Sequence, residues 1–250
     1  MSDRSVPKLD RHPVVKRLSQ HVALTSADLA DLDTIFEDEL SVRRRQDLVV
    51  PGAAYRKLGF VKSGYAVRYQ MLRDGRRHIL DVVLPGDIVG LPNGFYERAA
   101  YSVSAVKNLT VNICTLDDYV ELCYRRPQFA LALCWQTVQD ATIHAERGIG
   151  LGRRTPVERV AHFLLELHAR LRSAGLADAE GFASPFSQEI LADILGLSSP
   201  HLNRVLQQLR SDKLITLTER NVEFLNENAL RSIAHYDPPA MAQIPARIMS

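Results

Sequence analysis

The stretch from Phe186 to Asp212, FSQEILADILGLSSPHLNRVLQQLRSD, constrains the fold more than any other part of the chain. It predicts two short helices that meet at a glycine. Ser187 can cap the first helix, because its hydroxyl can accept from an amide of the first turn. Gly196 can take the left-handed conformation that ends this helix. Ser199 is then expected to cap the second helix, with Pro200 at its first position, where no amide donor is lost.

Both helices are predicted to bury one face. The apolar residues at helical spacing are Ile190, Leu191, Ile194 and Leu195 in the first helix and Leu202, Val205, Leu206 and Leu209 in the second. Arg204 then points almost directly away from the second buried face. An outward arginine can donate two hydrogen bonds to guanine, and asparagine or glutamine can pair with adenine. The simplest alternative is a helical hairpin whose polar face meets only water.

The spacing of small and apolar residues in this stretch resembles the helix-turn-helix motif. The matching positions are Ala192, Gly196 and Leu202, together with Leu191, Leu195, Leu197 and Val205. This resemblance makes Ser199–Ser211 the candidate recognition helix, which would enter a DNA major groove.

Composition bounds the remaining possibilities. The chain has 250 residues, 46% of them hydrophobic and 24% charged, which is ordinary for globular domains. A net charge of +2 is no nucleic-acid signature, so DNA affinity would depend on local placement of charge. No apolar run approaches the roughly 20 residues of a membrane span. The N-terminus lacks the hydrophobic core of a signal peptide, so we expect a cytoplasmic protein without membrane contact.

The first half of the chain changes from helical to β-prone texture. Residues 1–12 are expected to be flexible, and Pro13–Leu40 is predicted to be helical, with Ser26 as a candidate cap. Between Ser41 and Leu116, short β-prone runs alternate with turn signals, which predicts a small antiparallel roll. These runs are Leu48–Val50, Leu58–Val61, Tyr65–Met71, His78–Val83, Tyr101–Val106 and Thr110–Cys114. Asp74-Gly75 is a strong hairpin turn.

A helix is predicted at Asp117–Arg125, and a long one from about Gln128 to Ile149. The long helix carries an a/d seam of about three heptads, formed by Leu131, Trp135, Val138, Thr142, Ala145 and Ile149. We interpret the seam as a dimer coiled coil; the alternative is that it packs on its own roll. Phe129, Leu133 and Cys134 offer a second apolar surface for that packing. Gly148, Gly150 and Gly152 are expected to interrupt the helix as a hinge, or simply to end it.

The last part of the chain opens with Thr155-Pro156-Val157-Glu158, a capping box with proline at the first helical position. After the helix-turn-helix, Leu214–Thr218 and Val222–Leu225 predict a two-stranded wing. The expected fold class is α+β. It comprises a flexible N-terminus (1–12), an antiparallel β-roll (13–126), a dimerisation helix and hinge (127–152), a winged helix-turn-helix domain (153–236) and a flexible tail (237–250).

This order of elements resembles the Crp/Fnr family of bacterial transcription regulators, over roughly Pro13 to Tyr236. The most specific matches are FVKSGYAVRYQMLRDGRRHILDVVLPGDIVG, Phe60–Gly90, and LADILGLSSPHLNRVLQQLRSDKLI, Leu191–Ile215. The resemblance implies a cyclic-nucleotide-binding-like jelly roll that senses a small-molecule effector. It also implies a homodimer that binds double-stranded DNA at an inverted-repeat promoter site, with RNA polymerase as a further partner. Activation and repression both stay open.

In that family, the first residues of the recognition helix read bases. The DNA-binding candidates here are Ser187, Ser199, Pro200, His201, Asn203, Arg204 and Gln207. The better-studied members carry a Glu near the helix start, where this chain has Pro200, which cannot bond a base. Base preference should therefore differ, and Arg204 becomes the main candidate for a guanine contact.

The effector pocket also departs from the family pattern. Its candidate residues are Gly86, Asp87, Gly90, Leu91, Arg98 and Ala99. Cyclic-nucleotide binders in the family place Glu after the second glycine, for the ribose, and Ser or Thr after the arginine, which pairs with the phosphate. This chain has Leu91 and Ala99 instead. Losing both the acid and the hydroxyl argues against cAMP.

Other sensor chemistries fit no better. An iron–sulfur cluster needs a set of cysteines. The three cysteines of this chain, Cys114, Cys123 and Cys134, are too widely spaced for a metal or redox pair. We therefore expect them to be buried free thiols. Haem would need an axial ligand such as His78, although a lone strand histidine is more often structural. Arg43-Arg44-Arg45 is a candidate anion patch, although such runs usually face water. The cofactor stays unknown, and no metal site is expected.

Two functions from other classes compete with a DNA-binding regulator. The first is a ligand-binding module whose winged helix binds a protein partner, which the nearly neutral charge of the C-terminal segment favours. The second is an enzyme. The sequence shows no phosphate loop, HExxH motif, nucleophile elbow or paired carboxylates, so no catalytic residue is proposed.

Overall fold

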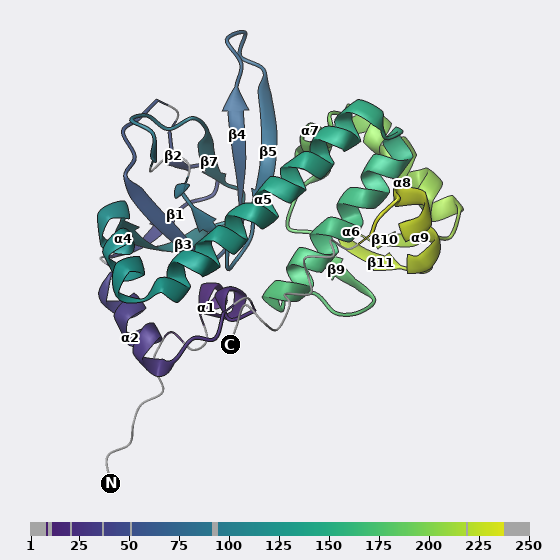
Figure 1. Ribbon diagram of the computed structural model, residues 1–250. Helices are drawn as coiled ribbons and strands as arrows, with labels where there is room; N and C mark the ends of the chain where they lie inside the picture. The colour runs from purple at the N-terminus through teal and green to yellow at the C-terminus, as the bar shows by residue number, and fades with distance from the viewer. Residues whose placement is uncertain are drawn as a thin grey trace.

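The computed structural model describes residues 9, 12–20, 22–36, 38–50, 52–91, 95–218 and 220–237. A β-roll forms one half of the molecule and a helical domain with a small sheet forms the other, with the long helix α5 (Pro127–Arg153) running across both (Figure 1). The predicted tail begins at Asp237, which the structure describes. Its remaining residues, 238–250, lie outside the described ranges.

Two short helices, α1 (Pro13–Leu18) and α2 (Ser26–Thr34), precede the roll. Thr25 caps α2 through a reciprocal capping box with Asp28, so the prediction of Ser26 as the cap is wrong. The helix predicted to reach Leu40 ends at Thr34. The residues from Asp38 onward form strand β1 (Asp38–Val42), which pairs with β8. Leu9 and His12, within the stretch predicted to be flexible, are both buried.

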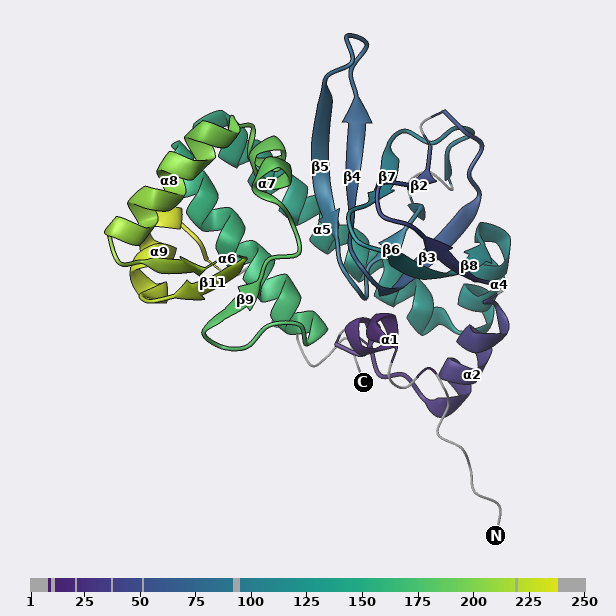
Figure 2. The same ribbon diagram turned by 180° about the vertical axis from the view of Figure 1, so that it is seen from behind.

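The roll consists of two four-stranded antiparallel sheets, ordered β1-β8-β3-β6 and β2-β7-β4-β5. The strands are β2 (Asp47–Val49), β3 (Lys57–Ser63), β4 (Ala66–Met71), β5 (Arg77–Val83), β6 (Ile88–Val89), β7 (Ser102–Ala105) and β8 (Leu109–Thr115). All six predicted runs are confirmed, whereas β1 and β6 escaped prediction. The hairpin at Asp74-Gly75 is also confirmed: it joins β4 to β5 and projects beyond the roll (Figure 2).

Helix α4 (Leu116–Arg125) leads into α5, which continues through all three glycines to Arg153. The prediction that Gly148, Gly150 and Gly152 interrupt the helix is therefore wrong. A glycine lowers helix stability by about 1 kcal/mol but does not by itself end a helix. The chain turns instead at Arg154, whose backbone is extended, just before Pro156 begins α6.

The C-terminal domain is built on α6 (Pro156–Ala174), whose predicted capping box between Thr155 and Glu158 is confirmed. The remaining elements are β9 (Gly181–Ala183), α7 (Gln188–Leu195), α8 (Ser199–Ser211), β10 (Ile215–Thr218), β11 (Asn221–Phe224) and α9 (Glu227–Ala234). The wing has three strands, ordered β10-β11-β9, because β9 adds to the predicted pair. Leucines of α6, α7 and α8 share the domain core with Leu230 of α9.

The three cysteines differ in exposure. Cys114 is buried as expected, but Cys123 is half-buried and Cys134 is exposed on α5, so the prediction of three buried thiols is wrong for these two. Cys134 faces outward because the buried side of α5 passes through Phe129, Ala132 and Gln136. None of the helices in the described ranges is long and apolar enough to cross a membrane.

Candidate nucleic-acid interface

The first helix of the motif, α7, begins and ends where the sequence predicts. The Ser187 hydroxyl accepts from the Ile190 amide at 3.4 Å, which satisfies one of the unpaired donors of the first turn. Gly196 ends the helix in the left-handed region, with φ of 62°. A side chain at this position would be strained, so glycine defines the turn between the two helices.

The second helix, α8, has a different cap from the predicted one. The backbone of Ser198 is extended and its hydroxyl accepts from the His201 amide at 3.4 Å, so Ser198 is the cap. Ser199 is the first helical residue and Pro200 follows in the first turn, where proline is still tolerated. The prediction of Ser199 as the cap is wrong by one residue, while the predicted helix bounds are confirmed.

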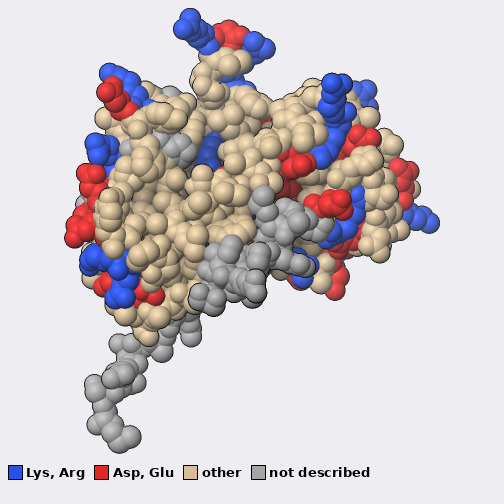
Figure 3. All heavy atoms as spheres, viewed as in Figure 1, with Lys and Arg blue, Asp and Glu red and all other residues tan. Residues whose placement is uncertain are grey.

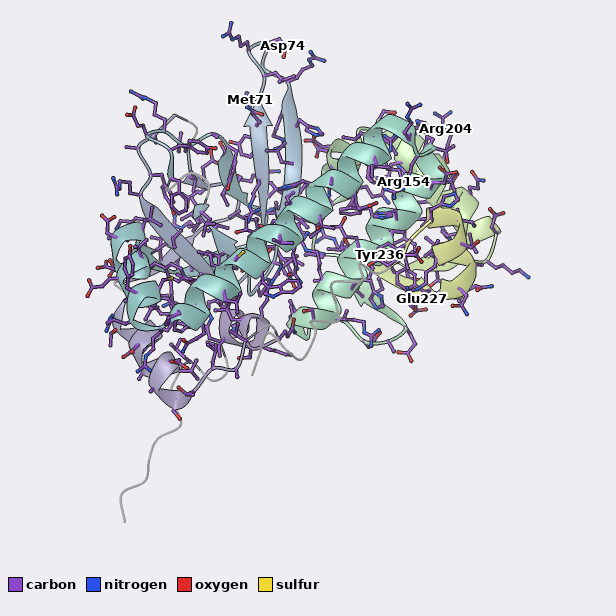
Figure 4. All side chains as sticks on the ribbon, in the orientation of Figure 1. Met71, Asp74, Arg154, Arg204, Glu227 and Tyr236 are labelled. Atoms are coloured by element: carbon purple, nitrogen blue, oxygen red, sulfur yellow. The ribbon has the colours of Figure 1, made fainter. Side chains whose placement is uncertain are left out.

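One side of α8 is buried and the other is open. Leu202, Val205, Leu206 and Leu209 are each at most 5% exposed. On the outer side, Ser199, Pro200, Asn203, Arg204 and Gln207 are exposed and His201 is half-buried. Ser187 is exposed at the start of α7. Figure 2 shows α8 on the outside of its domain, farther from the roll than α7, and Figure 4 shows the Arg204 side chain extending outward. The structure thus places six of the seven DNA-binding candidates on α8, five of them exposed.

This open face continues toward the wing. Gln207 and Arg210, with residues of β10, line a surface hollow of about 560 Å³. Sequence reasoning singled out Gln207 but not Arg210, although the spacing from Asn203 through Gln207 to Arg210 would have found it. Positive and negative side chains are interspersed on the face shown in Figure 3. On the outer side of α8, Arg204 and Arg210 are both exposed and could attract phosphate.

The predicted dimer seam of α5 is largely open. Leu131, Val138 and Ile149 are 37%, 39% and 49% exposed. Ala145 is exposed, and Trp135 and Thr142 are half-buried. The opposite side of the helix packs on the roll instead, with Phe129 and Ala132 fully buried. Packing of α5 on its own roll therefore uses Phe129 of the second surface together with Ala132, while Cys134 of that surface is exposed and the seam stays largely open.

A cavity of about 520 Å³ lies between the roll and α5. Its roll side includes Arg68, His78 and Leu91, and its helix side includes Gln136 and His144. Gln136 is 5% exposed, and its side-chain oxygen is buried without a hydrogen bond from any of the described residues. A buried oxygen without a donor is unfavourable, so it is a point at which a ligand or a water could bind. His78, the histidine considered for haem, thus faces a space between roll and helix.

The six residues predicted for an effector pocket, all within the described ranges, do not gather around this cavity. Leu91 lines it. Arg98 is exposed and donates to the Gly52 carbonyl at 3.0 Å, and Ala99 is buried in the core of the roll. Gly86 lies against α1, since an added Cβ would sit 3.0 Å from the Pro13 carbonyl oxygen.

Two further candidates, Gly90 and Asp87, are held by contacts within the protein. Gly90 has φ of 92°, and a Cβ there would lie 2.4 Å from the Lys57 carbonyl oxygen, so only glycine fits. Asp87 is 3% exposed and pairs with Arg17 and Arg170. Gly90 therefore holds a turn that requires glycine, while Asp87 makes contacts between helices α1, α6 and the roll.

Comparison with known proteins agrees with both halves of the structure. Residues 39–125 match the cyclic nucleotide-binding domain model, and residues 158–233 match the Crp-like helix-turn-helix domain model. The nitrogen fixation regulation protein FixK of Azorhizobium caulinodans is 30% identical over 174 residues, which cover 69% of this chain and 69% of FixK. The transcriptional activatory protein AadR of Rhodopseudomonas palustris is 29% identical over 173 residues, which cover 69% of this chain and 71% of AadR.

Among solved structures, FixK2 of Bradyrhizobium japonicum superposes with a TM-score of 0.71 at 27% identity, covering 78% of this chain and 96% of that one. The chain belongs to the Crp/Fnr family of transcription regulators. It is a DNA-binding regulator with a cyclic-nucleotide-binding-like domain, which decides against a winged helix that serves only a protein partner. The family consists of transcription regulators, which are not enzymes.

The regulator holds its two halves together with a buried ionic cluster. Asp81 of β5 is 1% exposed and lies 2.9 Å from Arg147 of α5 and 3.0 Å from Arg170 of α6. Arg68 of β4 is a third partner at 3.8 Å. Burial alone would raise the pKa of Asp81, but the three guanidinium groups, Arg170 foremost, hold it well below its usual range. Sequence reasoning missed this cluster, because its members lie far apart in the chain.

The same strand connects the roll to the helix-turn-helix of the regulator. β5 is an edge strand: in the part of the chain that the structure describes, no strand pairs with its outer side. The Ile79 amide donates to the carboxylate of Asp193 in α7 at 3.2 Å, and the Leu80 and Val82 carbonyls accept from Arg147 at 2.7 Å and Arg170 at 2.9 Å. Side chains of α5, α6 and α7 therefore complete this sheet edge.

Proposed function

We propose that this regulator binds an inverted-repeat promoter site as a homodimer, with one α8 in each of two major grooves. The observation that carries the proposal is the two-sided character of α8. Its leucines are buried in the domain, while Asn203, Arg204 and Gln207 are exposed on the outside. These are the side-chain types that form paired hydrogen bonds with guanine and adenine in the major groove.

The dimer would form along α5. The exposed seam residues follow a heptad pattern, and two parallel helices of this kind bury such seams against each other. A symmetric dimer matches a symmetric site, with half-sites about one helical turn, or roughly 34 Å, apart. The half-site separation would then depend on how α8 is held relative to α5. In this dimer, residues 13–126 would form the sensor roll, 127–152 the dimerisation helix and 153–236 the DNA-binding domain.

The dimer's output would be activation of transcription through contact with RNA polymerase. AadR and the FnrL protein of Cereibacter sphaeroides are both named as activators of transcription. A regulator of chromosomal promoters acts where the chromosome is, so we expect this one in the cytoplasm.

The cavity between the roll and α5 is the site where an effector would act. Its helix side carries Gln136, Asp140 and His144, so a ligand there would touch the dimer helix directly. The roll carries Leu91 and Ala99 at the positions where the family's cyclic-nucleotide binders have the acid and the hydroxyl that hold a ribose phosphate. The effector would therefore be a small molecule other than cAMP. Its binding would act through α5 on the position of the seven DNA-binding candidates and Arg210.

Selection of bound DNA from a random pool, with and without cell extract, tests this function. We expect an inverted repeat with guanine in each half-site, because Arg204 faces the groove. Enrichment only in the presence of extract would point to a small-molecule signal. If the purified dimer enriched no particular sequence from the random pool at modest salt, with or without extract, the proposal would be contradicted.

A further inference from the structure

The turn between α5 and α6 is held by one arginine of α6. The Arg159 guanidinium donates three hydrogen bonds to backbone carbonyls. Its Nε bonds the Gly150 oxygen at 3.0 Å, its Nη1 the Leu195 oxygen at 2.7 Å and its Nη2 the Arg154 oxygen at 3.2 Å. These oxygens belong to three segments: the end of the dimer helix, the turn after it and the end of the first motif helix.

The chemistry of the acceptors favours an arginine. Gly150 lies among the last four residues of α5, and Leu195 is the last residue of α7. Carbonyls at these positions lack partners within their helix and carry the negative end of the helix dipole. A planar guanidinium can bond several fixed oxygens at once, whereas the ammonium of lysine is a point charge without that geometry. Among the described residues, no carboxylate pairs with Arg159.

The surrounding contacts make this a close junction. An added Cβ at Gly196 would lie 3.0 Å from Cδ2 of Leu151 and 3.7 Å from Nη1 of Arg159. The end of α7 therefore lies against the end of α5, with the arginine beside both. Because α7 and α8 share a leucine core, any change in the position of α7 moves α8 with it.

We propose that Arg159 is a positioning residue for DNA recognition, which sets the half-site spacing that the dimer accepts. By bonding the ends of α5 and α7 at once, it fixes the recognition helix relative to the dimer helix. This inference rests on the proposed function, since spacing has meaning only for a dimer that reads two half-sites. It assigns the spacing to one side chain outside the DNA-contacting face.

The test compares Arg159→Lys with a matched control, Arg153→Lys. Arg153 lies at the same junction, at the end of α5, and is exposed. Full-length proteins are titrated with the selected repeat and with versions whose central spacer is one or two base pairs shorter or longer. We expect the wild type and Arg153→Lys to prefer one spacing by more than about tenfold. For Arg159→Lys we expect that preference to fall below about fivefold, the low end of typical coupling between sites.

A merely structural role would lower stability without changing spacing, so thermal unfolding and base preference within one half-site are measured for each variant. Arg159→Lys with lowered spacing preference, unchanged half-site preference and an intact dimer supports the proposal. An unchanged spacing preference overturns it. Arg159→Gln, which keeps a smaller planar donor, is the second variant, and failure of both variants to fold would also overturn a positioning role. A wild type that binds no repeat would contradict the proposed function itself.

Discussion

The two halves of this regulator organise their functional residues in different ways. In the C-terminal half, the DNA-reading candidates follow one another along α8, and a single turn at Gly196 places the helix. In the N-terminal half, the cavity draws residues from β4, β5, β6 and α5, and only Leu91 of the six residues predicted for an effector pocket lines it. A recognition helix is therefore a local structure, whereas the sensor site is made by contacts between distant segments.

The largest expected effect concerns the seam that would join two copies. Val138→Asp with Ile149→Asp places two charges on exposed seam positions without disturbing the core. We expect monomers, and a loss of about 10²- to 10⁴-fold in affinity for the inverted repeat, because two linked half-sites become one. Sedimentation and DNA titration measure this. Val120→Asp with Tyr124→Asp, on exposed positions of α4, is the control. An unchanged dimer in the seam variant would place the interface elsewhere.

The ionic cluster between the halves should dominate stability. Asp81→Asn leaves Arg68, Arg147 and Arg170 without their shared buried carboxylate, which we expect to cost about 3–5 kcal/mol of unfolding free energy. Urea unfolding measures the loss. Asp74→Asn, at the exposed hairpin tip (Figure 4), is the control and should change little. A loss below about 1 kcal/mol for Asp81→Asn would show that the cluster does not hold the halves together.

The recognition helix should show a smaller, sequence-dependent effect. Arg204→Ala is expected to cost about 1–3 kcal/mol at one base pair of each half-site and to relax specificity there. Titration against the selected site and single-base variants measures it. Arg210→Ala, nearer the wing, serves as the comparison on the same helix. If Arg204→Ala weakened binding equally on all sequences, Arg204 would be a phosphate contact instead.

The smallest expected effect is a pH dependence of stability. Burial lowers the pKa of His162 from its ordinary value of 6.5, and Arg154 adds to this, while Glu166 and Glu146 oppose it. The unfolded chain then binds the proton more readily, so stability falls as the pH drops below about 6.5 and levels off once the folded form is protonated. His12, whose pKa burial also lowers, contributes in the same direction.

Thermal unfolding between pH 7 and pH 5 measures this dependence. His162→Asn should flatten the decline, by about 1.4 kcal/mol for each unit by which the two states differ in pKa. His201→Asn, in the half-buried start of α8, is the comparison. A wild-type stability that rose on acidification would reverse the assigned sign.

The sequence by itself determined the parts of this regulator that depend on near neighbours. The period of leucines placed α7 and α8, the box at Thr155 started α6, and Asp74-Gly75 turned the β4–β5 hairpin. Each depends on hydrogen bonds or packing within a few residues, which a local pattern records. The errors there were small, as in the shift of the α8 cap from Ser199 to Ser198.

Only the tertiary structure decided which distant residues meet. It carried α5 through its glycines, gave Asp87 and Asp81 arginine partners on α6, and brought the Leu195 carbonyl within reach of Arg159. These contacts join residues from about 35 to 90 positions apart, and no spacing rule connects such positions. Buried charges are tolerated only where the fold supplies a partner, so their roles become visible once the halves are packed together.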